Sequence, residues 1–167
     1  ATHERPVEAH LRKRDETLAR TKRVKGAATA TDTWRDKILA EALDHVAFDG
    51  WYDKTLKAAA DKVGASDAEL KAAFPRGVAD ALLFFSSEAD RHAVEAIEKA
   101  DLKPMRVRER VTFAVRQRME AVMKHKEAAR RGAAVFALPQ HALDGTTAVY
   151  RTVDALWRAV GADREHH

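Results

Sequence analysis

Apolar residues recur every three to four positions along most of the chain, which is the spacing of one face of an amphipathic α-helix. The first regular stripe predicts a helix from Thr33 to about Phe48, with a capping box at its start and Asp49-Gly50 as its stop. The remaining stripes predict helices at about 78–100, 107–123, 128–138 and 140–160. No strand pattern interrupts this series, so we expect an all-α fold.

Residues 55–75 have the pattern of a helix-turn-helix. Leu56, Ala59, Ala60 and Val63 share one helical face, and Gly64 permits the left-handed backbone that ends a helix. Ser66 and Glu69 then form a capping box that starts a second helix, which Pro75 ends.

The second helix of this motif lacks the surface that reads DNA. Its expected exposed residues include Asp67 and Glu69, whose charge opposes phosphate, and Ala72 and Ala73, which offer no hydrogen bond. We therefore expect the scaffold of a DNA-binding motif without specific binding of nucleic acid.

Composition supports a helical chain and excludes several site types. Among the 167 residues there are only seven glycines and four prolines, and there is no cysteine, so disulfides and thiolate metal sites are excluded. No apolar run is long enough to span a membrane, and the polar N-terminus does not resemble a signal peptide. A cytoplasmic location is the resulting expectation.

Basic residues gather in two segments, 1–33 and 105–131, although the net charge is only +4. Such segments attract nucleic acid, anionic lipid or acidic proteins, and they are also common as ordinary solvated helix faces. We interpret 1–25 as a marginal helix or basic arm and 26–33, rich in Ala and Thr, as a linker. The predicted organisation is therefore an arm and linker (1–33), a helix-turn-helix subdomain (34–77) and a ligand-binding helical subdomain (78–165).

Catalytic motifs are missing from the chain. It has no Gly-rich phosphate loop and no Gly-x-Ser-x-Gly nucleophile elbow, so we do not expect an enzyme. Glu88 and His92 lie one helical turn apart, but the repeated Glu-x-x-His of a di-iron bundle is absent, and a local hydrogen bond or ion pair explains the two residues better than a metal.

The inward stripes of the later helices suggest a hydrophobic cavity. Methionine adapts to irregular shapes and suits lipid-like ligands, although periodicity alone does not separate a cavity lining from a filled core. The candidate lipid-binding residues are Phe84, Phe85, Val115, Met119, Met123, Phe136, Leu138, Val149 and Val153.

Short motifs in a fixed order resemble two related groups of proteins. The layout from Trp34 to Pro75 resembles the N-terminal domain of TetR-type regulators. The fuller set, over about residues 34–161, is similar to the bacterial form of the Coq-nine family of ubiquinone-biosynthesis lipid-binding proteins. Its motifs are Asp49-Gly50-Trp51 with Thr55-Leu56, Leu70 to Gly77, Arg108 to Val111 with Ala114 to Arg116, Ala137 to Gln140, and Val153 to Trp157 with Gly161.

The resemblance implies a TetR-like helical bundle that does not bind DNA, a pocket for ubiquinone precursors and no cofactor beyond a bound isoprenoid or phospholipid. It implies presentation of the lipid to the demethoxyubiquinone hydroxylase, at the inner membrane, by a peripheral and dimeric protein. The hydroxylase contact of the family corresponds here to Tyr150, Asp154, Trp157 and Arg158. Since Trp157 also falls on the apolar stripe, core packing is the alternative for this residue.

The chain departs from the family after Gly161, where further helices are expected, including an amphipathic one that docks on membranes. The chain is therefore expected to be either a bundle truncated after its last recognisable helix or a divergent member, with an incomplete pocket and dimer interface.

Two other functions remain open at this stage. A TetR-type transcriptional regulator would use the helix-turn-helix and the basic arm. A peripheral membrane protein held by charge alone would use Arg108, Arg116, Arg130 and Arg131, each contributing about 1 kcal/mol near an anionic surface.

Overall fold

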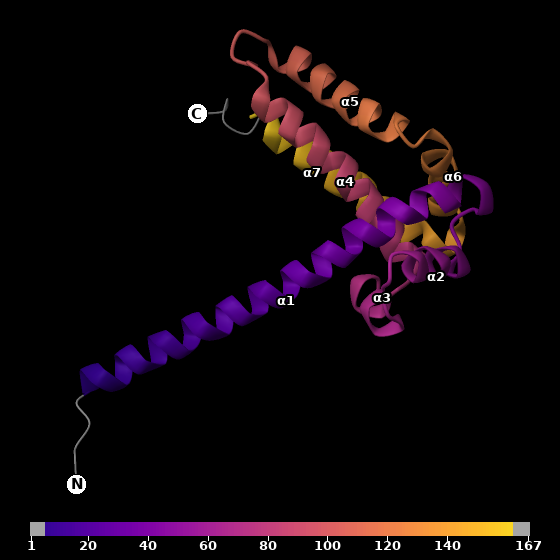
Figure 1. Cartoon of the computed structure of the whole chain (residues 1–167). Coiled ribbons are helices and arrows are strands. Elements are labelled where there is room, and N and C mark those ends of the chain that lie inside the picture. The colour runs from indigo at the N-terminus through magenta and orange to yellow at the C-terminus, as the bar shows by residue number, and fades with distance from the viewer. Residues whose placement is uncertain (1–5, 162–167) are drawn as a thin grey trace.

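The computed structural model describes residues 6–161, and within them the chain is all-α with no strand (Figure 1). This confirms the predicted all-α class. None of the described helices combines the length and the apolar character that crossing a bilayer requires. The elements are α1 (Pro6–Asp49), α2 (Asp53–Lys62), α3 (Asp67–Ala73), α4 (Val78–Lys99), α5 (Val107–Met123), α6 (Lys126–Phe136), the short 3-10 helix η1 (Pro139–His141) and α7 (Ala142–Ala159).

The predicted helix-turn-helix is present as α2 and α3. Gly64 between them has a φ of 79°, a left-handed conformation that favours glycine. Ser66 and Glu69 form the predicted capping box, because the Glu69 amide donates to Ser66 Oγ at 3.1 Å and the Ser66 amide donates to Glu69 Oε1 at 3.0 Å. The sequence therefore located this motif correctly.

The predicted linker at residues 26–33 is wrong, because α1 runs through it as one continuous helix (Figure 1). Ala27, Ala28 and Ala30 are strong helix formers, and a single Gly26 costs only about 1 kcal/mol inside a helix. Thr33 consequently lies inside α1 and does not begin a helix. The division of the chain into subdomains stays a prediction, and residues 1–5 and 162–165 of its outer parts lie outside the described residues.

The helices pack around two apolar clusters that share α4. The first cluster joins the second half of α1 to α2, α3, α4 and α6, and its most deeply buried large side chains include Ile38, Val46 and Leu82. The second joins α4, α5 and α7 through Ala93, Ile97, Ala114, Leu156 and Val160. The first half of α1 projects away from this body (Figure 1).

A turn at Lys124-His125 separates α5 from α6, so the basic segment 105–131 is two helices. The turn lets α6 pack against α1, while α5 lies along α4. The space bounded by α4, α5, α6 and α7 holds the candidate site.

Candidate functional site

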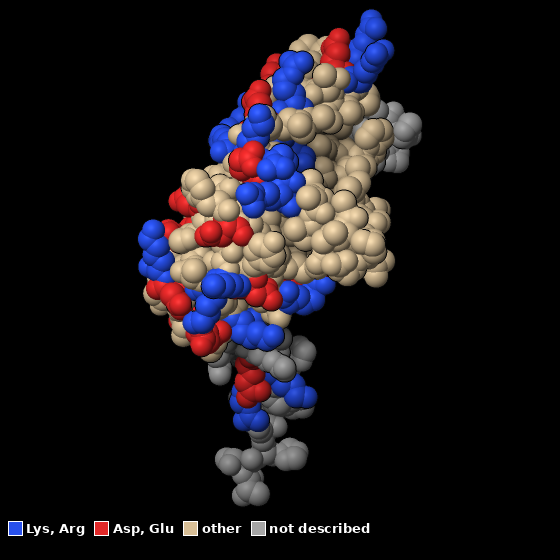
Figure 2. Space-filling view, turned by 90° about the vertical axis from the view of Figure 1, so that its right-hand side faces the viewer, with Lys and Arg blue, Asp and Glu red and all other residues tan. Residues whose placement is uncertain are grey.

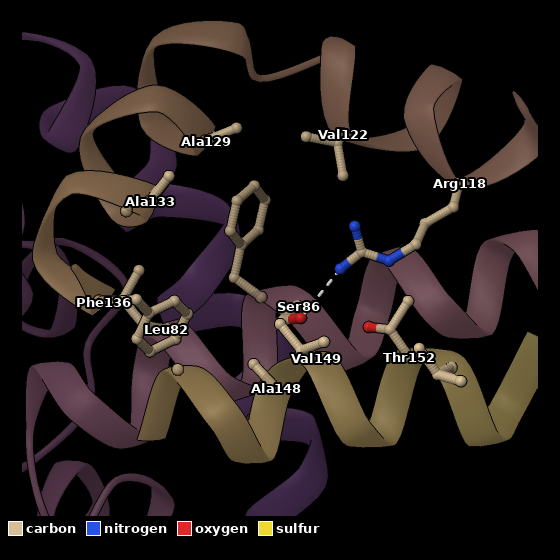
Figure 3. A pocket seen from close by; sticks show the side chains of 14 residues that line it. Leu82, Ser86, Arg118, Val122, Ala129, Ala133, Phe136, Ala148, Val149 and Thr152 are labelled. Atoms are coloured by element: carbon tan, nitrogen blue, oxygen red, sulfur yellow. Dashed lines mark hydrogen bonds between the residues drawn. The ribbon is translucent and has the colours of Figure 1, made fainter. Parts of the chain in front are cut away.

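A pocket of about 420 Å³ lies between α4, α5, α6 and α7 (Figure 3). Its volume is within the range of small-molecule pockets. Most of its lining is apolar, and a single charged side chain, Arg118, takes part. The lining residues are Leu82, Phe85, Ser86, Arg118, Val122, Ala129, Gly132, Ala133, Phe136, Gly145, Ala148, Val149, Thr152 and Val153.

The polar residues of the lining meet at one end of the pocket. Figure 3 shows Ser86, Arg118 and Thr152 together there, whereas Phe136 and Ala133 lie at the other end. The pocket therefore has an apolar end and a polar end, which is the arrangement that suits an amphipathic ligand.

Buried Asp90 of α4 organises the polar end from behind. Arg118 Nε donates to Asp90 Oδ1 at 2.6 Å, and Thr152 Oγ1 donates to the same oxygen at 2.7 Å. Arg118 Nη2 donates to Ser86 Oγ at 2.9 Å. These bonds tie α4, α5 and α7 together and fix the guanidinium in the pocket wall, since a charge-assisted network of this kind loses much if one member moves.

Two glycines set the width of the pocket. A Cβ at Gly132 would lie 2.8 Å from Leu82 Cδ2 and 3.4 Å from Trp51 Nε1, and one at Gly145 would lie 3.1 Å from the carbonyl oxygen of Phe136. The missing side chains therefore allow α6 to approach α4, and α7 to approach the end of α6.

Trp51, in the connection between α1 and α2, supports the pocket from beneath. Its Nε1 donates to the Ala128 carbonyl of α6 at 2.9 Å, and its ring packs against Phe85 with a centroid distance of 5.8 Å. The helix-turn-helix half of the molecule is thus joined directly to a pocket wall.

The structure brings together four of the candidate lipid-binding residues, and they lie on three helices. Phe85 of α4, Phe136 of α6 and Val149 and Val153 of α7 line the pocket. Phe84, another candidate lipid-binding residue, does not line the pocket. It packs against Phe74 at the first apolar cluster, with ring centroids 5.9 Å apart.

The other four candidates lie outside this pocket. Val115, Met119 and Met123 form an exposed stripe on α5, and Leu138 is exposed after α6. The prediction that this stripe faces inward is wrong, because Arg118 and Val122 form the pocket side of α5 and the stripe faces solvent. The sequence offered one signal for Arg118, since it is an arginine that lies between the apolar positions Val115 and Met119.

The candidate partner-binding residues lie on the surface of α7. Trp157 is 45% exposed and Tyr150 is 72% exposed, so neither is packed in the core. Arg158 Nε donates to Asp154 Oδ1 at 3.1 Å one turn away. Figure 2 shows that uncharged side chains gather on the side of the molecule that α7 forms.

Glu88 pairs with Arg91 in the structure, one turn from His92. The Glu88 carboxylate binds Arg91 at 2.8 Å, and this hydrogen bond raises the pKa of Arg91 above its ordinary value. Asp36 lines a second, smaller pocket together with Glu88 and His92. Desolvation of Asp36, and next the nearby charge of Glu88, raises the pKa of Asp36. Over residues 6–161 no group of three or more His, Asp and Glu side chains is placed to hold a metal ion.

The surface of α3 largely has the character expected from the sequence, with acidic side chains and few hydrogen-bond donors. One of the four residues expected to be exposed is buried. Asp67 is exposed and binds Lys57 at 2.6 Å, and Glu69 is engaged in the helix cap, whose backbone hydrogen bond from Ser66 lowers its pKa. Ala72 is exposed as expected. Ala73 is buried, because the helix is followed at once by Phe74, which enters the core.

The basic residues of α5 and α6 do not form one face. Arg108 and Arg116 are exposed, but Arg130 pairs with Glu127 at 2.8 Å and Arg131 is half-buried with its Nε shielded from solvent. The turn at residues 124–125 separates the two pairs, so the structure gives no support to a membrane surface made by these four charges together.

No known family model matches this chain, and no curated protein matches it either. The likeness to the Coq-nine family therefore rests on the short motifs and their order along the chain.

Proposed function

We propose that this protein is a non-catalytic lipid-binding accessory protein of ubiquinone biosynthesis, with the TetR-like bundle that its motifs suggest. The observation that carries the proposal is the pocket between α4, α5, α6 and α7, which has an apolar lining and one polar end. An isoprenoid quinone precursor has the same division into an apolar chain and a polar head. The ordered motifs supply the link to the Coq-nine family and to the pathway.

Presentation of the lipid to a partner is supported by the position of the exposed residues on α7. Val149 and Val153 line the pocket, while Tyr150, Asp154 and Trp157 lie at neighbouring positions of the same helix. A protein docked on this face would therefore sit beside the pocket. We propose the demethoxyubiquinone hydroxylase as this protein, on the basis of the family resemblance.

Peripheral association with the inner membrane is part of the same proposal. Val115, Met119 and Met123 expose an apolar stripe on α5, next to the helix that carries the partner-binding residues. Exposed apolar stripes of this kind mark surfaces for lipid or protein. A membrane in contact with α5 would deliver a lipid close to the pocket.

Filling the pocket is expected to remove bound lipid without unfolding the protein. Ala133 lines the pocket and is exposed, so Ala133→Trp places an indole in the cavity with little strain on the core. We expect at least a tenfold loss of lipid that co-purifies with the protein, measured by organic extraction and native mass spectrometry.

The matched control is Ala134→Trp, since Ala134 is also exposed on α6 but does not line the pocket. The control variant should retain lipid at the level of the unmodified chain. A lipid-free unmodified protein, or equal lipid retention in both variants, would contradict the proposed function.

A further inference from the structure

Arg118 presents its terminal nitrogen Nη1, which carries two N–H groups, to the pocket. Its Nε is bound to Asp90 and its Nη2 to Ser86, while no hydrogen bond engages Nη1 among residues 6–161. Figure 3 shows the bond to Ser86 from one terminal nitrogen, and the other terminal nitrogen turned toward the side where Val122 lies. An arginine guanidinium has N–H donors and no acceptor, so this group only donates hydrogen bonds.

Each neighbouring hydroxyl group is engaged in one role only, so Ser86 can still donate its own hydrogen and Thr152 Oγ1 can still accept one. Thr152 Oγ1 donates its hydrogen to Asp90, and Ser86 Oγ accepts from Arg118. A ligand head that reaches this end of the pocket therefore meets the N–H groups of Arg118 and the O–H of Ser86, and a ligand oxygen that accepts hydrogen bonds matches these donors.

The charge of Arg118 is compensated before any ligand arrives. Asp90 is only 6% exposed and lies 2.6 Å from the guanidinium, so the pair is neutral as a whole. An anionic head would add an uncompensated negative charge to an apolar pocket beside this carboxylate, at a high desolvation cost. An uncharged acceptor would take the hydrogen bond without that cost.

We propose that the pocket selects amphipathic lipids whose head is an uncharged oxygen acceptor, such as a ketone or quinone carbonyl, over lipids with a carboxylate head. Arg118 donates to the head, and Asp90 is the positioning residue that sets the charge of the site. This inference rests on the proposed function, because it requires that the pocket holds a lipid.

The test compares two probes of equal carbon number, 2-tridecanone and tridecanoate, bound to the full chain. The side-chain ¹⁵N–¹H signals of arginine, followed by NMR during titration, give both the affinity and the donor involved. We expect the unmodified protein to bind the ketone about tenfold more tightly than the carboxylate and to shift the Arg118 signal.

Asp90→Asn keeps an acceptor for Arg118 and Thr152 but removes the compensating charge. In this variant the affinity for tridecanoate is expected to rise about tenfold, because Asp90 no longer neutralises Arg118 and the ligand carboxylate does so instead. The affinity for the ketone should stay within about twofold. A change in fold alone would weaken both probes together. Arg116→Gln is the matched control, because Arg116 is exposed on the same helix outside the pocket, and it should leave both affinities unchanged.

The comparison of probes on the unmodified protein needs no variant. Equal affinities for ketone and carboxylate would overturn the inference and leave lipid binding in place. Failure of both probes to bind would overturn the proposed function together with it.

Discussion

Replacing Trp51 with alanine is expected to lower the free energy of unfolding by about 3–5 kcal/mol. Trp51 is 5% exposed and contacts α6 through its hydrogen bond to the Ala128 carbonyl and α4 through Phe85. Truncation removes this apolar contact and leaves a cavity under the pocket. Thermal unfolding followed by circular dichroism should show a decrease in Tm on the order of 10 °C.

Trp51→Phe separates the two contributions, because it keeps most of the ring contact and removes only the indole N–H. We expect a smaller loss of about 1–2 kcal/mol in the same measurement. If Trp51→Ala unfolded within 1 °C of the unmodified protein, the indole would not be joining the two halves of the molecule as described.

The contacts of Trp51 give the helix-turn-helix a structural role, although the acidic surface of α3 would repel the phosphates of DNA. The motif packs against the second half of α1 and holds Trp51 beneath α6, so it acts as a base for the pocket. Gly132 contributes to the same junction, since any side chain there would meet both Leu82 and Trp51. The scaffold therefore has a structural use that is independent of DNA.

The fold was largely predictable because its signals are local. The capping box at Ser66 and Glu69, the glycine stop at Gly64 and the stripe of α4 each depend on residues within a turn or two, and all three appear in the structure. The linker predicted at residues 26–33 was wrong because this segment carries no local apolar signal for a helix. A short stretch of Ala and Thr has no apolar periodicity, but helix propensity and continuity with the following turns keep it helical.

The site was predictable only in part, since a pocket is formed by packing between helices. Periodicity identified the inward side of α7 and so found Val149 and Val153, yet it assigned Met119 to the interior when α5 turns that stripe outward. The observed rotation of α5 turns Arg118 toward Asp90, which lies 28 positions earlier in the sequence. A pattern within one helix could not predict the contact between Arg118 and Asp90, because the two residues lie on different helices.

The exposed face of α7 carries the second large prediction. Trp157 and Tyr150 lie seven positions apart on a helix and are both exposed, next to the ion pair of Asp154 with Arg158. Large aromatic side chains with an apolar body commonly dominate the energy of an interface. Because the core-packing alternative for Trp157 does not fit its 45% exposure, a substitution there should leave the fold intact.

Trp157→Lys is expected to weaken binding to the proposed partner, the demethoxyubiquinone hydroxylase, by about 2–4 kcal/mol, a loss of roughly 30- to 1,000-fold in affinity. The stability of the domain should change by less than about 1 kcal/mol, since the new charge remains in contact with solvent. Titration calorimetry with the purified hydroxylase, paired with thermal unfolding of each variant, measures both quantities. Tyr150→Lys should behave in the same way, whereas Tyr52→Lys, an exposed aromatic residue outside α7, should leave the affinity unchanged. Retained binding by Trp157→Lys would remove this face of α7 as the partner surface, and a collapse of Tm would return Trp157 to a structural role.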